Sequence, residues 1–353
     1  MTDPLLLETA ERALSDTCTH EAIQGAERDG WAPGVWAALA EVGLPWLAVP
    51  EAAGGMGGTI ADGLAVLRLA GAHAAPVPLA ETGLLAGWLL AGAGLRVAGG
   101  PATVVPGRPE DTVSISDGVL WGTAHRVPWA RSASLIVVLA QDAGAWTVAA
   151  VSTAACRVEA AANLAGEPRD TVVFERAEPA QMAPAPAGVD GVALRGRGAL
   201  TRIALMAGAL ERLSRLTIEY THQRVQFGRP VARFQAVQQH LVTGAQEAAL
   251  VVTAAQVAAR AAEQGPAGFE IAAGKLLANR AAATATRAAH QAHGAMGMTQ
   301  EYPLHHLSRR LWAWRSEYGD EHHWSTRLGA AVAAAGADLL YPAIAGGSAV
   351  LEV

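Results

Sequence analysis

Residues 220–230 read Tyr-Thr-His-Gln-Arg-Val-Gln-Phe-Gly-Arg-Pro. They follow a long apolar run with helical periodicity and end in Gly-Arg-Pro, which cannot continue a helix because proline lacks an N–H and glycine is flexible. Arg224, Gln226 and Phe227 therefore come together where the helix ends. The guanidinium of Arg224 can donate paired hydrogen bonds to a phosphate or a carboxylate, and the other two side chains can flank a planar ring. Taken alone, the stretch equally fits a helix end with a solvated arginine.

Two further segments carry glycine-rich turns. Residues 291–298 read Gln-Ala-His-Gly-Ala-Met-Gly-Met, and Glu-Tyr-Pro follows at residues 301–303. Near the N-terminus, residues 42–58 contain Val-Pro-Glu followed by Gly-Gly-Met-Gly-Gly. In this order and separation the segments resemble the acyl-CoA dehydrogenase superfamily, most strongly in the C-terminal half of the chain.

The resemblance implies an α+β fold with an N-terminal helical domain, a middle β domain and a C-terminal four-helix bundle. It also implies that FAD is the cofactor, since the R-x-Q-F-G and Q-x-x-G-G-x-G turns of the superfamily both bind it. On the matching positions, the expected FAD-binding residues are Arg224, Gln226, Phe227, Gln291, His293 and Gly294. The first three residues of one chain would meet the last three of a neighbouring chain at a subunit interface.

The pattern of the sequence fits the same order of domains. Apolar residues recur at helical spacing at first, short β-rich runs separated by Gly, Asp and Pro follow, and Ala-rich helical runs complete the chain. We therefore predict a helical domain over residues 1–97, a β domain over 98–192, and a helical bundle with the FAD site and oligomer interface over 193–353. Within the β domain, Asp117-Gly118 predicts a hairpin, and residues 179–187 read as a connector.

The Ala-rich runs 235–262 and 267–292 are apolar on more than one face, so a single chain would expose a large apolar surface to solvent. We predict a homo-oligomer or a heterotetramer. Hydrophobic residues make up 51% of the 353 residues and charged residues only 16%, which also fits surface buried between subunits.

Composition excludes several other classes of protein. The net charge of −6 provides no basic field for nucleic acid. Cys18 and Cys156 lack metal or redox spacing, which favours a reducing, cytoplasmic setting. Neither a signal peptide nor an uninterrupted apolar run of spanning length is evident, so we expect no membrane span. Adjacent histidines such as His322 and His323 point in different directions on a helix, so we predict no metal site.

The superfamily dehydrogenates acyl-CoA thioesters: a glutamate removes the α-proton, and the β-hydrogen leaves as hydride to the flavin. In most members this base lies in a [YE]-E-G-T segment after the Glu-Tyr-Pro turn. A gapless alignment from Glu301 places Tyr318 at the base position and Glu317 one residue before it. A smaller branch carries the base just before an arginine on the first bundle helix, where this chain has Thr201 and Arg202.

Three interpretations follow. Glu317 is the catalytic base in a locally shifted backbone, with Arg202 in contact with the acyl-CoA substrate and an electron-transfer flavoprotein as acceptor. Alternatively, the chain is a non-catalytic partner that completes the FAD site of a longer homologue, or it performs altered flavin oxidase or oxygenase chemistry. The simplest structural role for Glu317 is a surface ion pair with Arg315 or Arg309. The superfamily's T-E-P-x-x-G-S-D and W-I-T-N segments are missing from the β-rich part of the chain, which favours the partner interpretation.

Overall fold

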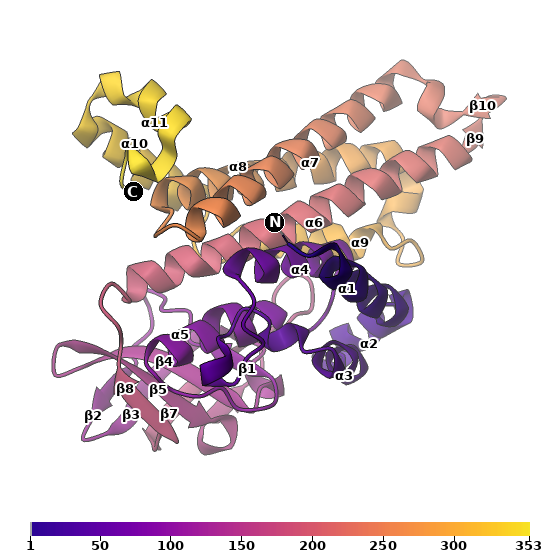
Figure 1. Cartoon of the computed structure of the whole chain (residues 1–353). Coiled ribbons are helices and arrows are strands. Elements are labelled where there is room, and N and C mark those ends of the chain that lie inside the picture. The colour runs from indigo at the N-terminus through magenta and orange to yellow at the C-terminus, as the bar shows by residue number, and fades with distance from the viewer. Residues whose placement is uncertain (1) are drawn as a thin grey trace. The chain divides into compact units, whose positions relative to one another are not determined.

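The computed structural model describes residues 2–353 and divides into two compact units. One unit comprises the chain up to Val66 and from Pro76 to Gly198, and the other comprises Leu67–Ala75 and Ala199–Val353. Helices, then strands, then helices follow one another along the chain (Figure 1). This order confirms the predicted α+β fold class, while the domain boundaries after residues 97 and 192 stay predictions.

Capping side chains begin the first two N-terminal helices, and a glycine ends the second. The Asp3 side chain caps the first helix by accepting a hydrogen bond from Leu5 N, and Thr19 caps the second helix in the same way. Gly30 ends that second helix in a left-handed conformation, with φ of 91°. The helices are α1 (Pro4–Thr17), α2 (His20–Asp29), α3 (Pro33–Glu41), α4 (Ile60–Ala72), a π-helix (Ala80–Gly87) and α5 (Trp88–Gly92).

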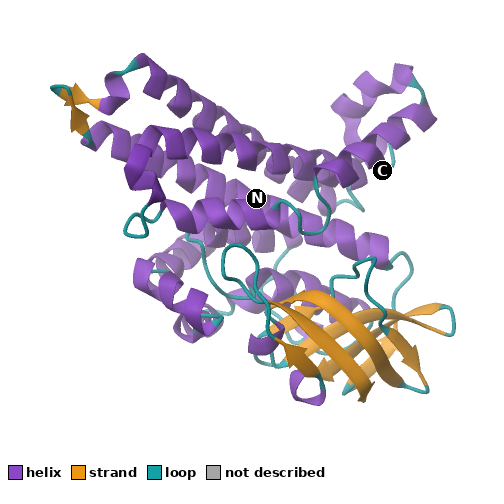
Figure 2. Cartoon of the chain, turned by 180° about the vertical axis from the view of Figure 1, so that it is seen from behind, coloured by secondary structure: helices purple, strands orange, loops and turns teal. Residues whose placement is uncertain are grey.

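Two four-stranded sheets follow, with strand orders β1-β4-β5-β8 and β2-β3-β7-β6 (Figure 2). Strands β1 and β4 pair in parallel, and the other pairs described in these two sheets are antiparallel. Side chains from both sheets, including Leu120, Ile136, Val151 and Phe174, form a single buried core. The strands are β1 (Ala102–Val104), β2 (Ser114–Ser116), β3 (Val119–Pro128), β4 (Leu135–Asp142), β5 (Ala145–Ser152), β6 (Arg157–Glu159), β7 (Arg169–Ala177) and β8 (Gln181–Pro184).

The hairpin predicted at Asp117-Gly118 joins β2 to β3, and both residues have positive φ. The prediction of a connector over residues 179–187 was wrong, because Gln181–Pro184 pairs with β5 as an edge strand, where proline is tolerated. Strand β3 was not predicted. Its register shifts between Ala124 and Val127, and this irregularity breaks the alternation by which a strand is recognised.

The second unit is helical. Its helices are α6 (Gly191–Gln223), which begins in the first unit, α7 (Gln235–Ala262), α8 (Gly268–His293), α9 (Leu304–Trp314), α10 (Glu321–Ala335) and α11 (Leu340–Gly346). A two-stranded hairpin, β9 (Val225–Gln226) and β10 (Arg229–Pro230), follows α6. The hairpin lies at one end of the bundle, and α10 and α11 lie at the other end (Figures 1 and 2).

Close backbone contact explains two glycines of this unit. A side chain at Gly208 would overlap the carbonyl oxygen of Arg68, and one at Gly71 would overlap that of Leu205. The end of α4 therefore packs directly against α6, and glycine allows the two backbones to approach.

Helix α7 has the length and hydropathy of a helix that could cross a membrane, and so does the bent pair formed by α10 and residues 337–349. This qualifies the expectation of no membrane span. Only 22% of the apolar part of α7 is buried within the chain, and α7 packs along α8. Val242, Leu250 and Val257 are about half exposed on it. Such a surface fits the predicted oligomer, whose existence stays a prediction.

Candidate functional site

The hairpin after α6 gathers the residues that the sequence singled out. Arg224 N closes the last helical turn on Tyr220 O at 2.8 Å, and Val231 N donates to Arg224 O at 2.8 Å. Phe227 and Gly228 have φ of 51° and 76° at the hairpin turn. Arg224 and Gln226 are exposed, and the Phe227 side chain is 91% exposed. A guanidinium, an amide and an aromatic ring thus project together from the bundle.

An aromatic cluster joins the end of α6, just before the Arg224 hairpin, to the segment 291–303. The ring of His293, at the end of α8, stacks on Tyr220 of α6 with centroids 4.5 Å apart and planes at 19°. Tyr302 packs against both rings, at 5.4 Å from Tyr220 and 5.0 Å from His293. The Tyr302 hydroxyl also donates to Leu216 O at 3.4 Å. Both segments are thereby fixed to one another within one chain.

The sequence analysis did not predict that Tyr220 and Tyr302 would pack against His293 and connect the two segments. Gln291 and Gly294 are exposed beside the cluster, and Gly294 has φ of 60°, which favours glycine. The two turns therefore leave both sets of predicted residues at the surface of the second unit, apart from the buried His293. Their predicted meeting across a subunit interface stays a prediction.

The hydrogen bonding of His293 fixes its tautomer. Its Nδ1 lies 2.8 Å from Ala289 O, so Nδ1 carries the proton and Nε2 is an acceptor. Nε2 is buried and has no hydrogen-bond partner within residues 2–353, and the same holds for Nδ1 of His290. Burial lowers the pKa of both histidines, which keeps the rings neutral near pH 7. Each ring nitrogen leaves a polar position for a bound group or water to satisfy.

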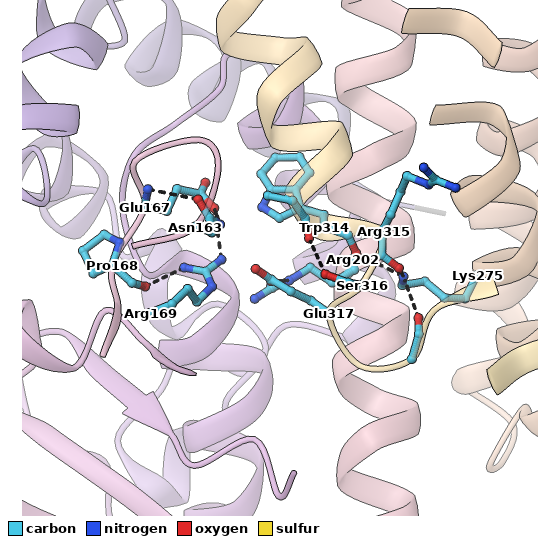
Figure 3. A network of polar contacts seen from close by, with 12 residues as sticks. Asn163, Glu167, Pro168, Arg169, Arg202, Lys275, Trp314, Arg315, Ser316 and Glu317 are labelled. Atoms are coloured by element: carbon cyan, nitrogen blue, oxygen red, sulfur yellow. Dashed lines mark hydrogen bonds and ion pairs between the residues drawn. The ribbon is translucent and has the colours of Figure 1, made fainter. Parts of the chain in front are cut away.

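A second polar centre lies deeper in the same unit. Arg202 Nε, on α6, donates to Glu317 Oε2 at 2.6 Å, although the two residues are 115 positions apart in the sequence (Figure 3). The Arg202 side chain is 1% exposed and that of Glu317 is 15% exposed. The guanidinium also lies 5.3 Å from the centre of the Tyr318 ring. The carboxylate proposed as a base and the arginine proposed to bind substrate thus form an ion pair with each other.

This arrangement brings together the two positions to which the sequence resemblance assigns the superfamily's base. Thr201 and Arg202 represent one position, and Glu317 and Tyr318 represent the other. The simple alternative paired Glu317 with Arg315 or Arg309 at the surface, and the structure does not pair it with Arg315. Arg315 instead lies 3.6 Å from Glu321 and stacks over Trp312.

Lys275 is the only lysine of the chain, and it is fully buried on α8. Its Nζ donates to Asn279 Oδ1 at 2.6 Å and to the carbonyl oxygens of Trp314, Arg315 and Gly319, each at 3.1 Å (Figure 3). Burial lowers the pKa of Lys275 to about 7, while the Glu317 charge acts in the opposite direction. Because four oxygen atoms surround Nζ and all are acceptors, the surroundings fit the ammonium form.

The turn from Arg315 to Asp320 has a constrained backbone. Tyr318 has φ of 54° and Gly319 has φ of 106°. Trp324 Nε1 donates to Tyr318 O at 3.2 Å, and a side chain at Gly319 would overlap that same nitrogen. Glu317 therefore lies in a turn whose shape requires glycine at position 319.

The first unit has its own buried polar network, also drawn in Figure 3. Glu167 Oε2 accepts from Asn163 Nδ2 at 2.8 Å and from Arg169 Nη2 at 3.0 Å. The Asp170 carboxylate, which is fully buried, pairs with Arg131. These bonds hold the loop between β6 and β7. Within residues 2–353, no group of three or more His, Cys, Asp and Glu could hold a metal ion.

Comparison with known proteins identifies the family of this chain. The family model described as "Acyl-CoA dehydrogenase, C-terminal domain" matches residues 195–321. Acyl-CoA dehydrogenase FadE28 of Mycobacterium tuberculosis is 30% identical over 307 residues, which cover 76% of this chain and 84% of the relative. The chain belongs to the acyl-CoA dehydrogenase family.

Other relatives of this acyl-CoA dehydrogenase homologue match over a larger share of its length. Acyl-CoA dehydrogenase IpdE2 of Mycolicibacterium smegmatis is 27% identical over 304 residues, covering 85% of this chain and 89% of that protein. A chain of the ChsE4-ChsE5 complex from Mycobacterium tuberculosis has the same fold, with a TM-score of 0.86. The sequences are 24% identical, and the match covers 94% of this chain and 98% of the other.

Proposed function

We propose that this chain is a subunit of a heteromeric, FAD-dependent acyl-CoA dehydrogenase that acts on the α,β-bond of an acyl-CoA thioester. Membership of the family supports the reaction. The ChsE4-ChsE5 complex, which is heteromeric by name, supports the assembly. We further propose a cytoplasmic location and an electron-transfer flavoprotein as the electron acceptor.

The residues of the second unit fit an FAD group. Arg224 offers forked N–H donors to a phosphate, and Phe227 offers an exposed ring face. His293 offers an acceptor nitrogen in a fixed tautomer, adjacent to the exposed Gln291 and Gly294. FAD, when bound, supplies the acceptor for the hydrogen that leaves the thioester as hydride. The chain's own contribution is to hold and orient that group, and a partner subunit would complete the site.

The Arg202–Glu317 ion pair is the observation that carries the assignment as a partner subunit. A general base must reach the substrate proton and accept it. The Glu317 carboxylate faces a guanidinium at 2.6 Å and is 15% exposed, so accepting a proton would require it to give up that pair. Thr201 and Tyr318, which occupy the family's base positions, carry no carboxylate. The glutamate that removes the α-proton would therefore come from a longer homologous subunit.

Purification of the chain alone and with such a homologue tests this proposal. The homologue should retain the [YE]-E-G-T segment that this chain has lost. We expect flavin absorbance and dehydrogenation of acyl-CoA in the co-purified complex, and neither in the isolated chain. A homo-oligomer of this chain that holds FAD and dehydrogenates an acyl-CoA would refute the assignment and make Glu317 the leading candidate for the base.

A further inference from the structure

We propose that Lys275 is a positioning residue: its ammonium group holds the turn 315–320 in the shape that places Glu317 against Arg202 and Tyr318 beside the pair. The proposal concerns a residue outside the hairpin 224–230 and the turn 291–298. Its relevance to catalysis rests on the proposed function, whereas its effect on the turn does not.

The contacts of Lys275 tie two parts of the second unit together. Nζ accepts no bond and donates to the last carbonyl of α9, at Trp314, and to the next one, at Arg315. Carbonyl groups at a helix end lack intrahelical partners, and a cation stabilises them through both hydrogen bonding and the helix dipole. The same Nζ reaches across the turn to Gly319 O. One buried group therefore bonds to both ends of the turn that carries Glu317 and Tyr318.

The turn needs such a constraint because its backbone is unfavourable. A non-glycine residue with positive φ, as at Tyr318, costs energy unless the surroundings hold it. Trp324 restrains the turn through Tyr318 O, and Lys275 restrains it through three further carbonyl oxygens. Without the ammonium group, three buried carbonyl oxygens would lose a charged donor. The turn could then relax toward ordinary backbone angles, which would move the Glu317 carboxylate away from Arg202.

Limited digestion with trypsin measures this restraint directly, because the bond after Arg315 lies at the start of the turn. Lys275→Met removes the charge and keeps the length of the side chain. Lys275→Gln retains N–H donors and is the second variant if Lys275→Met does not fold. The matched control is Thr286→Val, which removes a different, part-buried polar contact of α8, to Trp312 Nε1. Circular dichroism checks that each variant keeps its helices.

We expect cleavage after Arg315 to be at least about tenfold faster in Lys275→Met, in line with the loss of a charged donor by three carbonyl oxygens, and unchanged in Thr286→Val. In the complex with the longer homologue, the kcat of Lys275→Met should fall by about threefold, within the less than about tenfold change expected for loss of the Glu317 carboxylate itself. Equal cleavage rates in wild type and both Lys275 variants would overturn the proposal. A loosened turn with wild-type kcat would overturn its functional part. An inactive wild-type complex would instead count against the proposed function, since the digestion requires neither flavin nor activity.

Discussion

Replacing Arg202 with methionine should destabilise the second unit by about 3 kcal/mol. At a separation of 2.6 Å and an effective dielectric constant of about 20, the attraction between Arg202 and Glu317 is about 6 kcal/mol. Desolvation of the buried guanidinium offsets part of this attraction. Removing one partner of a buried pair typically costs 3–5 kcal/mol, and we expect about the lower limit because Glu317 is 15% exposed and water can reach it.

Urea unfolding followed by far-UV circular dichroism measures the loss in free energy of unfolding. In a thermal melt, Tm should fall by about 6–12 °C. The double variant Arg202→Met/Glu317→Leu should recover most of the loss, because an apolar pair leaves no buried charge. Arg215→Met is the control on the same helix. Its exposed pair with Glu211 should contribute less than about 1 kcal/mol. A loss below about 1 kcal/mol for Arg202→Met, with no recovery in the double variant, would refute the reasoning.

Three other perturbations have defined outcomes. Gly319→Ala should cost at least about 1 kcal/mol in urea unfolding, because of the positive φ and the overlap with Trp324, and wild-type stability would contradict this. Burial lowers the pKa of His290 and His293 below the ordinary 6.5, so the unfolded chain binds more protons than the folded one as pH falls through and below 6.5. The free energy of unfolding should therefore decrease as the pH falls below 6.5, and it should decrease less in a His290→Asn/His293→Asn variant. Identical dependence on pH in the wild type and the variant would contradict this. Arg224→Ala should weaken FAD retention by the complex about tenfold, measured by fluorescence titration, and an unaltered affinity would remove Arg224 from the FAD site.

The helical half of the fold was predictable because its periodicity and its stop signals are local. The long runs 235–262 and 267–292 match α7 and α8 within a residue, and α6 ends at Gln223, before the Gly-Arg-Pro of residues 228–230. Strand β3 was not predicted, because a register shift interrupts its pattern and its pairing with β7 depends on residues about fifty positions away.

In the candidate site, too, the residues in a local motif were predictable and those joined by distant contacts were not. The exposed hairpin carrying Arg224 and Phe227 was recognisable from a short motif. The pairing of Arg202 with Glu317 was not, since nothing local links residues 115 positions apart. A signal for Lys275 was present: a single lysine within an apolar, Ala-rich helix needs buried acceptors. Apart from Asn279 Oδ1, those acceptors are backbone carbonyl groups, which no side-chain motif records.

The rate of dehydrogenation by the complex carrying Glu317→Gln tests the central claim most directly. Glutamine keeps a side-chain oxygen for Arg202 and cannot act as a carboxylate base. If the α-proton is removed by the partner subunit, kcat should change by less than about tenfold, as for a residue that supports the site without transferring the proton. A fall of about a hundredfold or more with FAD fully bound, the scale of a lost general base, would contradict the account and assign the base to this chain.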